Sequence, residues 1–473
     1  MGCNKSKLDG ASQQRVDGFE EFIEPDSIFQ CLETGHTRLV KMRYLLKLAK
    51  EGAILPRRQD LPEEAFLSVK ELKKMYQNSL SRYGKGTKAG QGEHMLPVVA
   101  ISACWLTPSH PDPKGQQLKT VAKMLDRESA KYLQFFPYVG VFWDWVSLYQ
   151  PDAEGIRTEE EEGAYNIALH ETMALWYAHQ GTTVYRVTEL PEGASRPVGY
   201  DNSGWTTFER CCTEQIKKFH TLDAWWILVR DLAKDAGDET FRRWPTGPDD
   251  FDELIERKQF TKKSDKDAVK ALYRTMSMKQ LSGVQKLAFH GMPSPTLEDM
   301  TRFGRCLNIC QELTSLGLGG VSMNGQCLAA MLEQLQDGSL TKLEHFALGT
   351  NNIGNEGMKA LGKAISRALF ANVKRLYMNN NNIGSEGVEV FAAAVAETEG
   401  NKLDTLEELR IANNKITDDG LNAFSKALNE GALSSIKLIV IGSNAYSTGA
   451  KAAFKLACKQ RKIEAKSDFF HEL

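Results

Sequence analysis

The sequence predicts an α/β fold in two parts, a parallel sheet covered by helices and a C-terminal solenoid of α/β repeats. Short apolar runs alternate with helical stretches between residues 97 and 229, which favours a parallel sheet buried on both faces. Beyond residue 340 a motif of leucines and asparagines recurs at a regular spacing. All eight tryptophans lie between Trp105 and Trp244, before that motif begins, so we place a domain boundary near residue 276.

Length and composition are consistent with more than one folded unit. A chain of 473 residues exceeds what one hydrophobic core usually serves, and 42% apolar with 25% charged residues is ordinary for a globular protein. The net charge is -2, and the charged residues form no long block of one sign. Nucleic acid is therefore not expected as a partner. The nine cysteines lack the paired spacing of a zinc site and are interpreted as reduced thiols, and we predict no bound metal. No run is apolar and long enough to span a membrane or form a signal peptide, so we expect neither integration nor secretion.

The first residues match a lipidation pattern. Gly2 would be exposed by removal of Met1, Ser6 stands at the sixth position, and Cys3 would accept a palmitoyl group. A single myristoyl chain binds membranes only marginally, with a constant of about 10⁴ M⁻¹, whereas two acyl chains anchor a protein stably. We predict that residues 1–30 form a flexible acylated tether holding the chain on the cytoplasmic face of a membrane. Because a six-residue pattern also arises by chance, a cytoplasmic location without acylation is the alternative.

Residues 31–95 are predicted to form a helical segment. Leu39, Met42, Leu45, Leu46 and Ala49 recur at helical spacing. A second helix is expected from Pro62 to Lys74, because proline suits the first turn of a helix. The glycine- and lysine-rich stretch 81–94 lacks the spacing of a phosphate-binding loop and is interpreted as a linker.

The predicted α/β domain covers residues 96–275. Its strands are expected at 97–102, 138–143, 182–187 and 225–229, and its helices near 115–130, 161–179 and 205–219. After Pro245-Thr-Gly-Pro248, a helical extension is expected to residue 276.

Residues 276–473 are predicted to form the solenoid. The pattern LxxLxLxxNxIxxxG occurs three times in full, with its asparagines at Asn351, Asn381 and Asn414, and a fourth copy contains Asn444. Degenerate copies precede these, around Leu316 and Leu287. The central leucines would form one short strand per repeat, and the asparagine would satisfy backbone groups where the chain leaves the strand. This pattern resembles the ribonuclease-inhibitor class of leucine-rich repeats.

A solenoid of this class exposes a concave strand face on which a partner binds. The outward strand positions supply polar and aromatic side chains typical of protein binding. In the alternative interpretation, this face of the solenoid folds back on the α/β domain of the same chain. The candidate partner-binding residues are His345, Lys374, Arg375, Tyr377, Glu408 and Arg410, with Ala347 and Lys437 at neighbouring strand positions.

Three local motifs in residues 96–232 resemble those of the heterokaryon-incompatibility (HET) domain, which is itself similar to TIR domains. A first strand ends in Ala100-Ile-Ser-Ala-Cys-Trp105, a second continues as Phe142-Trp-Asp-Trp-Val-Ser-Leu-Tyr-Gln150, and Gly204-Trp-Thr-Thr-Phe-Glu209 opens a later helix. The resemblance implies a TIR/flavodoxin-like parallel sheet. It also implies an effector or self-association role.

In many TIR domains a glutamate four residues after a tryptophan is essential for NAD cleavage, and Glu209 stands at that distance from Trp205. Thr206 replaces the cysteine of the TIR pattern, which places the sequence nearer the HET version. A carboxylate there would stabilise the oxocarbenium-like transition state as the nicotinamide–ribose bond breaks. The resemblance makes NAD a candidate substrate rather than a resident cofactor.

Further polar groups are expected beyond the strand ends, where open parallel sheets bind ligands. The candidates are Ser102, Asp144 and Ser147, with Trp105 and Trp205 as candidate cofactor-binding residues. Each also has a structural interpretation, because serine and aspartate cap turns and helices and tryptophans commonly pack in cores.

Three functional hypotheses therefore stay open. The first is a membrane-tethered signalling or sensor protein with protein-binding repeats. The second is an NAD glycohydrolase of the TIR type. The third follows from the similarity of the repeats to those of Ran GTPase-activating proteins and would make the chain a regulator of a small GTPase.

Overall fold

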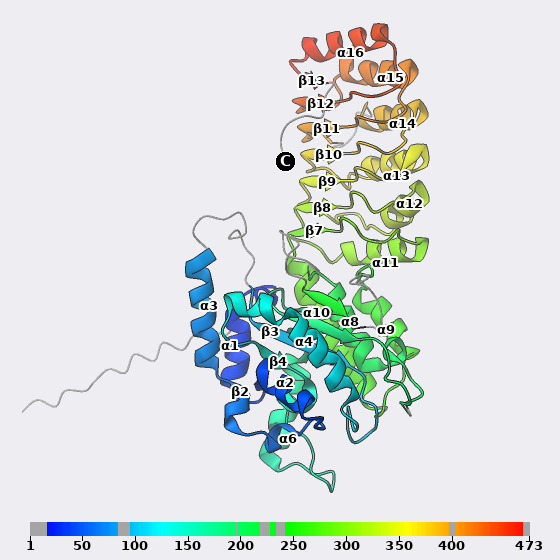
Figure 1. Ribbon diagram of the computed structural model, residues 1–473. Helices are drawn as coiled ribbons and strands as arrows, with labels where there is room; N and C mark the ends of the chain where they lie inside the picture. Colours follow the sequence, from blue (N-terminus) through cyan, green and yellow to red (C-terminus); the bar gives the residue numbers. More distant parts are fainter. Residues whose placement is uncertain are drawn as a thin grey trace, which may run out of the picture. The chain divides into compact units, whose positions relative to one another are not determined.

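A computed structural model describes residues 17–83, 95–194, 196–217, 228–232, 242–396 and 403–466 (Figure 1). The chain divides into two compact units, one of residues 1–101 with 111–183 and the other of residues 102–110 with 184–473. Gly2 and Cys3, and most of the strand predicted at 225–229, lie outside the described residues. Within the described ranges, no helix has the length and apolar character needed to cross a membrane.

The first unit combines helices with short strands. Its elements are α1 (Pro25–Glu33), β1 (Leu39–Lys41), α2 (Met42–Lys50), β2 (Phe66–Leu67), α3 (Val69–Tyr83), β3 (Val98–Ala103), α4 (Gln116–Phe135), β4 (Gly140–Phe142), α5 (Asp144–Ser147), α6 (Glu159–Ile167) and α7 (Met173–Ala178). β3 and β4 are parallel, as predicted. Val98 to Ile101 are all buried, which explains why this strand has a continuous apolar run.

The segment 31–95 differs from its prediction in two ways. It contains helices, but β1 and β2 also lie within it, and β1 pairs antiparallel with both β2 and β4. Leu39 was assigned to a helical repeat, yet it is a buried strand residue and the helix begins at Met42. Strands of two or three residues are too short for a period of two to show in a sequence. Also, α1 begins at Pro25, inside the predicted tether.

The α/β part of the second unit contains β5 (Thr183–Val187), α8 (Gly204–Glu214), β6 (Val229–Asp231), α9 (Pro248–Glu256) and α10 (Asp265–Gly283). β5 and β6 are parallel. The helical extension packs against α8: Gln215 Nε2, just after α8, donates to Ser277 Oγ at 2.7 Å, and the Phe208 ring of α8 lies edge-on to the Tyr273 ring with centroids 6.4 Å apart.

The boundary predicted near residue 276 falls inside α10, which runs through that position without interruption. The first repeat strand begins three residues after α10 ends. Trp244 lies against Phe289 and Phe303 of the first repeat, with ring centroids 5.2 and 5.4 Å away. The aromatic side chains therefore join the segment after β6 to the start of the solenoid in one core.

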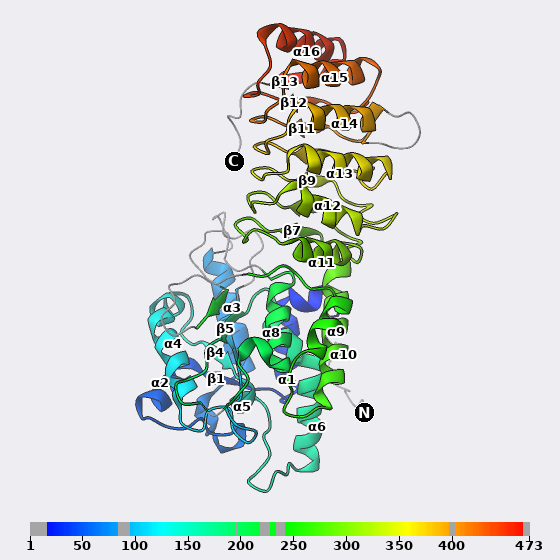
Figure 2. The same cartoon turned by 90° about the vertical axis from the view of Figure 1, so that its right-hand side faces the viewer.

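The solenoid continues as seven strands that alternate with six helices along the described chain. They are β7 (Lys286–Ala288), α11 (Leu297–Leu307), β8 (Ser315–Gly317), α12 (Gly325–Glu333), β9 (His345–Ala347), α13 (Gly354–Ser366), β10 (Arg375–Tyr377), α14 (Ser385–Ala396), β11 (Glu408–Arg410), α15 (Asp418–Asn429), β12 (Leu438–Val440), α16 (Thr448–Gln460) and β13 (Glu464–Lys466). The strands pair in chain order as one parallel sheet. Figures 1 and 2 show the strands stacked on one side and α11–α16 on the other. The predicted repeats, including the degenerate early copies, are thus present, and β13 adds a strand that the motif did not predict.

The repeated asparagines satisfy the backbone, as predicted. Asn414 Oδ1 accepts hydrogen bonds from the backbone N–H groups of Asn381 at 2.9 Å and Ile383 at 3.0 Å. Its Nδ2 donates to the carbonyl oxygens of Met378 at 3.1 Å and Ile411 at 2.9 Å. One side chain therefore connects two adjacent repeats, and the buried amide explains why the motif requires asparagine.

Candidate functional site

The register of the parallel strands aligns the predicted partner-binding residues. His345 is opposite Arg375, and Arg375 is opposite Glu408, at the first position of β9, β10 and β11. Tyr377 and Arg410 are aligned at the third position. The middle residues of these strands, Phe346, Leu376 and Leu409, are buried in the core. The side chains at the first and third positions therefore project from the other face of the sheet, away from the core.

Four of these residues form a connected group that we call the concave cluster: His345, Tyr377, Glu408 and Arg410. The Arg410 guanidinium carbon lies 4.6 Å from the centroid of the Tyr377 ring, and the His345 ring packs edge-on against the same ring at 4.7 Å. Arg410 Nε donates to Glu408 Oε1 at 2.5 Å, and Tyr377 Oη donates to Glu408 Oε2 at 3.2 Å. The cluster therefore offers an aromatic surface held in place by a cation and a carboxylate.

Two pKa values in the cluster are displaced. Partial burial, followed by the positive charge of Arg375, lowers the pKa of His345. Partial burial and the nearby Glu408 carboxylate raise the pKa of Tyr377. Both shifts favour the neutral form of the ring. Two predicted residues lie outside the cluster: Lys374, whose Nζ is 2.6 Å from Glu344 Oε1, and Arg375, which is exposed.

The structure brings together two of the predicted catalytic residues, Ser102 and Glu209. Ser102 Oγ donates to Glu209 Oε2 at 2.5 Å and lies 2.6 Å from Tyr200 Oη. Glu209 is 7% exposed, and both Ser102 and Tyr200 are buried. Burial raises the pKa of the Tyr200 phenol well above its usual value, and the Glu209 carboxylate adds to this rise. Tyr200 was not predicted, because it lies in a three-residue 3₁₀ helix, Tyr200–Asn202, which is too short to show a periodic pattern in the sequence.

Asp144 and Ser147 make local contacts in α5. Asp144 Oδ1 accepts a hydrogen bond from the backbone N–H of Trp145 at 2.7 Å, and Ser147 Oγ accepts one from that of Trp143 at 3.1 Å. These contacts are consistent with the alternative interpretation that both residues stabilise a turn. Their participation in catalysis stays a prediction.

The two candidate cofactor-binding tryptophans also have structural contacts. The backbone oxygen of Trp105 accepts a hydrogen bond from Arg196 Nη1 at 2.5 Å. Trp205 Nε1 donates to Asp265 Oδ2 at 2.9 Å and its ring packs edge-on against Phe208. Trp205 thus attaches α8 to the start of α10. Cofactor binding by either residue stays a prediction.

A buried ionic network lies beside this group and was not predicted. Glu214 Oε1 accepts from Arg186 Nη1 at 2.9 Å, and its Oε2 accepts from Arg210 Nη1 at 2.6 Å. Arg186 also donates to both carboxylate oxygens of Asp231, at 2.5 and 2.8 Å. The available signals were an arginine inside an apolar strand and the four-residue spacing of Arg210 and Glu214 on one helix face.

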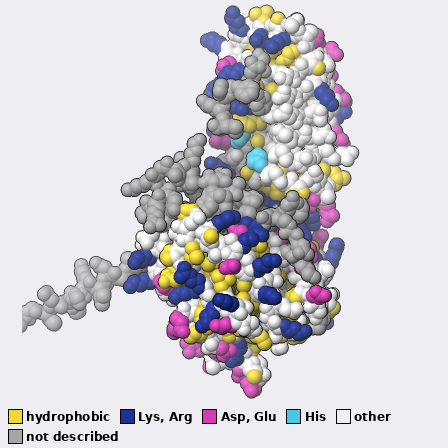
Figure 3. Space-filling model, viewed as in Figure 1, with side chains coloured by type: hydrophobic (Ala, Val, Ile, Leu, Met, Phe, Trp, Pro, Cys, Tyr) yellow, Lys and Arg dark blue, Asp and Glu magenta, His cyan; other side chains and the backbone are white. Residues whose placement is uncertain are grey.

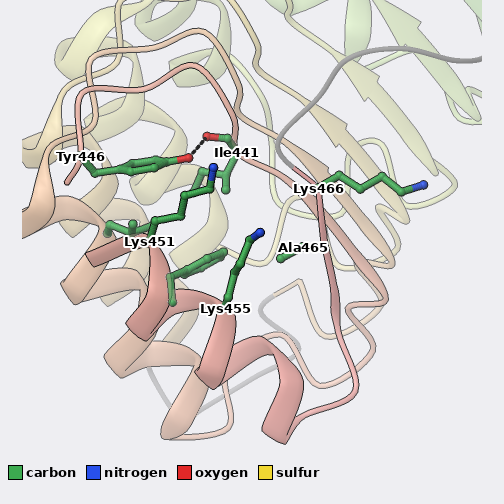
Figure 4. A pocket seen from close by; sticks show the side chains of 8 residues that line it. Ile441, Tyr446, Lys451, Lys455, Ala465 and Lys466 are labelled. Atoms are coloured by element: carbon green, nitrogen blue, oxygen red, sulfur yellow. Dashed lines mark hydrogen bonds between the residues drawn. The ribbon is translucent and has the colours of Figure 1, made fainter. Parts of the chain in front are cut away.

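A small pocket lies at the last repeat, between α16 and the last strands. It is lined by Leu421, Ile441, Tyr446, Lys451, Phe454, Lys455, Ala465 and Lys466. Figure 4 shows the Lys451 side chain beside the Tyr446 ring and Lys455 farther from that ring, whereas Lys466 points away from both lysines. Figure 3 shows lysine and arginine side chains gathered at this end of the solenoid. Among the residues that the structure describes, no group of three or more potential ligands could hold a metal ion.

Comparison with known families agrees with the repeat geometry. Residues 339–362, 371–392 and 402–425 match a family model described as leucine-rich repeat. These segments cover the three complete copies of the motif. No curated protein matches the chain. The chain therefore carries leucine-rich repeats between residues 339 and 425, and such repeats generally mediate protein–protein interactions.

Proposed function

We propose that this protein binds a protein partner through the concave face of its leucine-rich repeats, as the sensor or scaffold of a membrane-tethered signalling system. The observation that supports this proposal is the concave cluster. Tyrosine and arginine are enriched among the residues that dominate binding free energy at protein interfaces. Tyr377 is partly exposed, and its ring is fixed by His345 and Arg410, so little side-chain entropy would be lost on binding.

Replacement of Tyr377 tests the proposal. We expect Tyr377→Ala to weaken the partner complex at least about thirtyfold, corresponding to about 2 kcal/mol for a dominant interface residue. Partners are recovered with the wild-type chain from cells, identified by mass spectrometry, and titrated against purified variants. Lys363→Ala is the matched control, because Lys363 is exposed on α13 and away from the strands. A partner that binds Tyr377→Ala as tightly as wild type would contradict the proposal.

The tether is the second part of the proposal. It is supported by the pattern Met1-Gly2-Cys3 with Ser6, in which a myristoyl and a palmitoyl group would act together. We expect Gly2→Ala to move most of the protein from the membrane to the soluble fraction, because loss of the first acyl group leaves no stable anchor. Cell fractionation followed by immunoblotting measures the distribution. Equal membrane recovery of the variant and the wild type would reject the tether.

The α/β half is proposed to act as a TIR/HET-like effector or self-association domain. Support comes from its three motifs and from β3, β4 and β5, which lie where the strands were predicted. The Ser102–Glu209 contact is the observation that favours NAD cleavage as a second candidate, although Glu209 would have to exchange its bond to Ser102 for one to the substrate. An assay for nicotinamide release, with Glu209→Gln as the inactive comparison, tests this candidate. A role toward a small GTPase is supported by the repeats alone.

A further inference from the structure

The charges of the concave sheet are not balanced. On β7–β13, Arg410 pairs with Glu408 at 2.5 Å and Lys466 with Glu464 at 3.3 Å. Just before the strands, Lys374 pairs with Glu344 at 2.6 Å and Lys437 with Glu407 at 2.9 Å. Across the part of the sheet that the structure describes, this leaves Lys286 on the first strand and Arg375 in the middle without an ion-pair partner. Arg375 is exposed.

His345, directly opposite Arg375 in the strand register, has an incomplete set of hydrogen bonds. Its Nδ1 lies 3.4 Å from Ser315 Oγ, whereas its Nε2 is shielded from solvent and has no partner. A shielded ring nitrogen without a partner is unfavourable, and native structures rarely keep one without a reason. An unpaired guanidinium and an unsatisfied imidazole therefore lie next to each other.

We propose that Arg375 and His345 form a binding site for an anionic group of the protein partner, a carboxylate or phosphoryl group on an acidic segment. This inference rests on the proposed function, since it specifies the chemistry of the partner that the concave face binds. Arg375 would supply the planar pair of N–H donors that suits a carboxylate or phosphate. His345 would supply a second donor once it is protonated.

The surroundings favour an anion over a cation. The carboxylate of Glu408, which is opposite Arg375 in the strand register, is already occupied by Arg410 and by the Tyr377 hydroxyl. Glu344, which lies just before β9, is occupied by Lys374. A cationic ligand would meet Arg375 and Arg410 without a free carboxylate. An anion would instead compensate the excess positive charge.

The same geometry couples binding to protonation. The groups facing His345 are Ser315 on β8, Arg375 and Tyr377 on β10, and Glu408 and Arg410 on β11. Burial, followed by the positive charges of Arg375 and Arg410, keeps the pKa of His345 below its usual value, and the Glu408 carboxylate only partly opposes this. A bound anion favours the imidazolium, so it raises this pKa. Affinity for the anion must then increase as the pH falls through the bound-state pKa, and it levels off below the free-state pKa.

Sulfate is a suitable probe, because it stays doubly charged across the pH range in which histidine titrates. The full chain is labelled with ¹³C at histidine, its His345 resonance is identified with His345→Asn, and its pKa is measured by NMR with and without sulfate. We expect sulfate to raise the pKa of His345 in the wild type and to do so far less in Arg375→Gln. Lys363→Gln is the control, because it removes an exposed positive charge from α13 and should leave the sulfate effect unchanged.

The outcomes separate this inference from the proposed function. An unchanged His345 pKa in sulfate, or a shift that persists in Arg375→Gln, would overturn the anion site. Acetate and phosphoserine, titrated at equal concentration, distinguish a carboxylate from a phosphoryl ligand by which one raises the pKa more. If sulfate raises the pKa of His345 through Arg375 but the partner binds Tyr377→Ala as tightly as wild type, the proposed function alone is overturned. If Tyr377→Ala weakens partner binding but sulfate leaves the pKa of His345 unchanged, the anion site alone is overturned.

Discussion

Glu214→Ala is expected to lower the free energy of unfolding by about 3–5 kcal/mol, the range typical of removing one partner from a buried ion pair. The side chains of Glu214, Arg186 and Arg210 are only 3%, 2% and 7% exposed. Arg186 would keep its two bonds to Asp231. Arg210 would keep only the 3.6 Å ion-pair contact of its Nε with Asp201, which is too long for a hydrogen bond, so most of the destabilisation comes from this guanidinium.

Guanidinium-induced unfolding followed by tryptophan fluorescence measures this loss. All eight tryptophans lie between Trp105 and Trp244, so the signal reports mainly the α/β half, with Trp244 reporting its junction with the first repeat. Glu160→Ala is the control, because Glu160 is exposed on α6, and its change should stay within about 0.5 kcal/mol. The double variant Arg210→Met/Glu214→Leu should recover part of the free energy of unfolding that Glu214→Ala loses. It removes the Arg210 guanidinium, which is the charge that Glu214→Ala would leave unpaired. A loss below about 1 kcal/mol in Glu214→Ala would show that the network is not a stabilising unit.

The solenoid could be predicted because each motif residue has a fixed physical task. Each leucine of LxxLxLxxN fills an equivalent core position in every repeat. The asparagine satisfies equivalent backbone groups each time. Once the repeat length is known, the strand register follows, and with it the faces of the side chains. This is why His345, Tyr377, Glu408 and Arg410 could be assigned to the exposed strand face from the sequence.

The α/β half was less predictable, because its contacts join residues that are far apart in sequence and do not repeat. Apolar runs marked β3, β4 and β5, but two- and three-residue strands such as β2 and β1 leave no periodic signal. The boundary near residue 276 was inferred from where tryptophans end. In the structure the aromatic core continues from Trp244 to Phe289 and Phe303, so a change in composition did not mark a change in packing.

The candidate catalytic site was predictable only in part, for a similar reason. The motif resemblance identified Glu209, and the position at a strand end identified Ser102; the two residues form a hydrogen bond. Tyr200 completes that group, yet no neighbour in sequence indicates its role. The Glu214–Arg210 pair had a visible spacing on α8, but burial decides whether such a spacing is a solvated surface pair or a core network, and sequence alone does not give burial.

Asn414→Ala is expected to destabilise the repeats by about 2–4 kcal/mol, since it leaves buried backbone groups unsatisfied at about 1–3 kcal/mol each. The N–H groups of Asn381 and Ile383 lose their acceptor, and the Met378 carbonyl loses a donor. Because repeats interact mainly with their neighbours, the loss should be concentrated in β10–β12. Hydrogen exchange of the backbone amides, with thermal unfolding by circular dichroism, measures both its size and its location.

Asn414→Asp separates the two halves of this side chain's role. Aspartate keeps an oxygen for the N–H groups of Asn381 and Ile383, but it places a second oxygen against the carbonyls of Met378 and Ile411, where the amide donated. We therefore expect Asn414→Asp to be at least as unstable as Asn414→Ala near neutral pH. Its stability should rise as the pH falls and the carboxylate takes up a proton that restores a donor. Asn422→Ala on the exposed face of α15 is the control, and equal exchange rates in β10–β12 of Asn414→Ala and this control would refute the role assigned to the asparagine ladder.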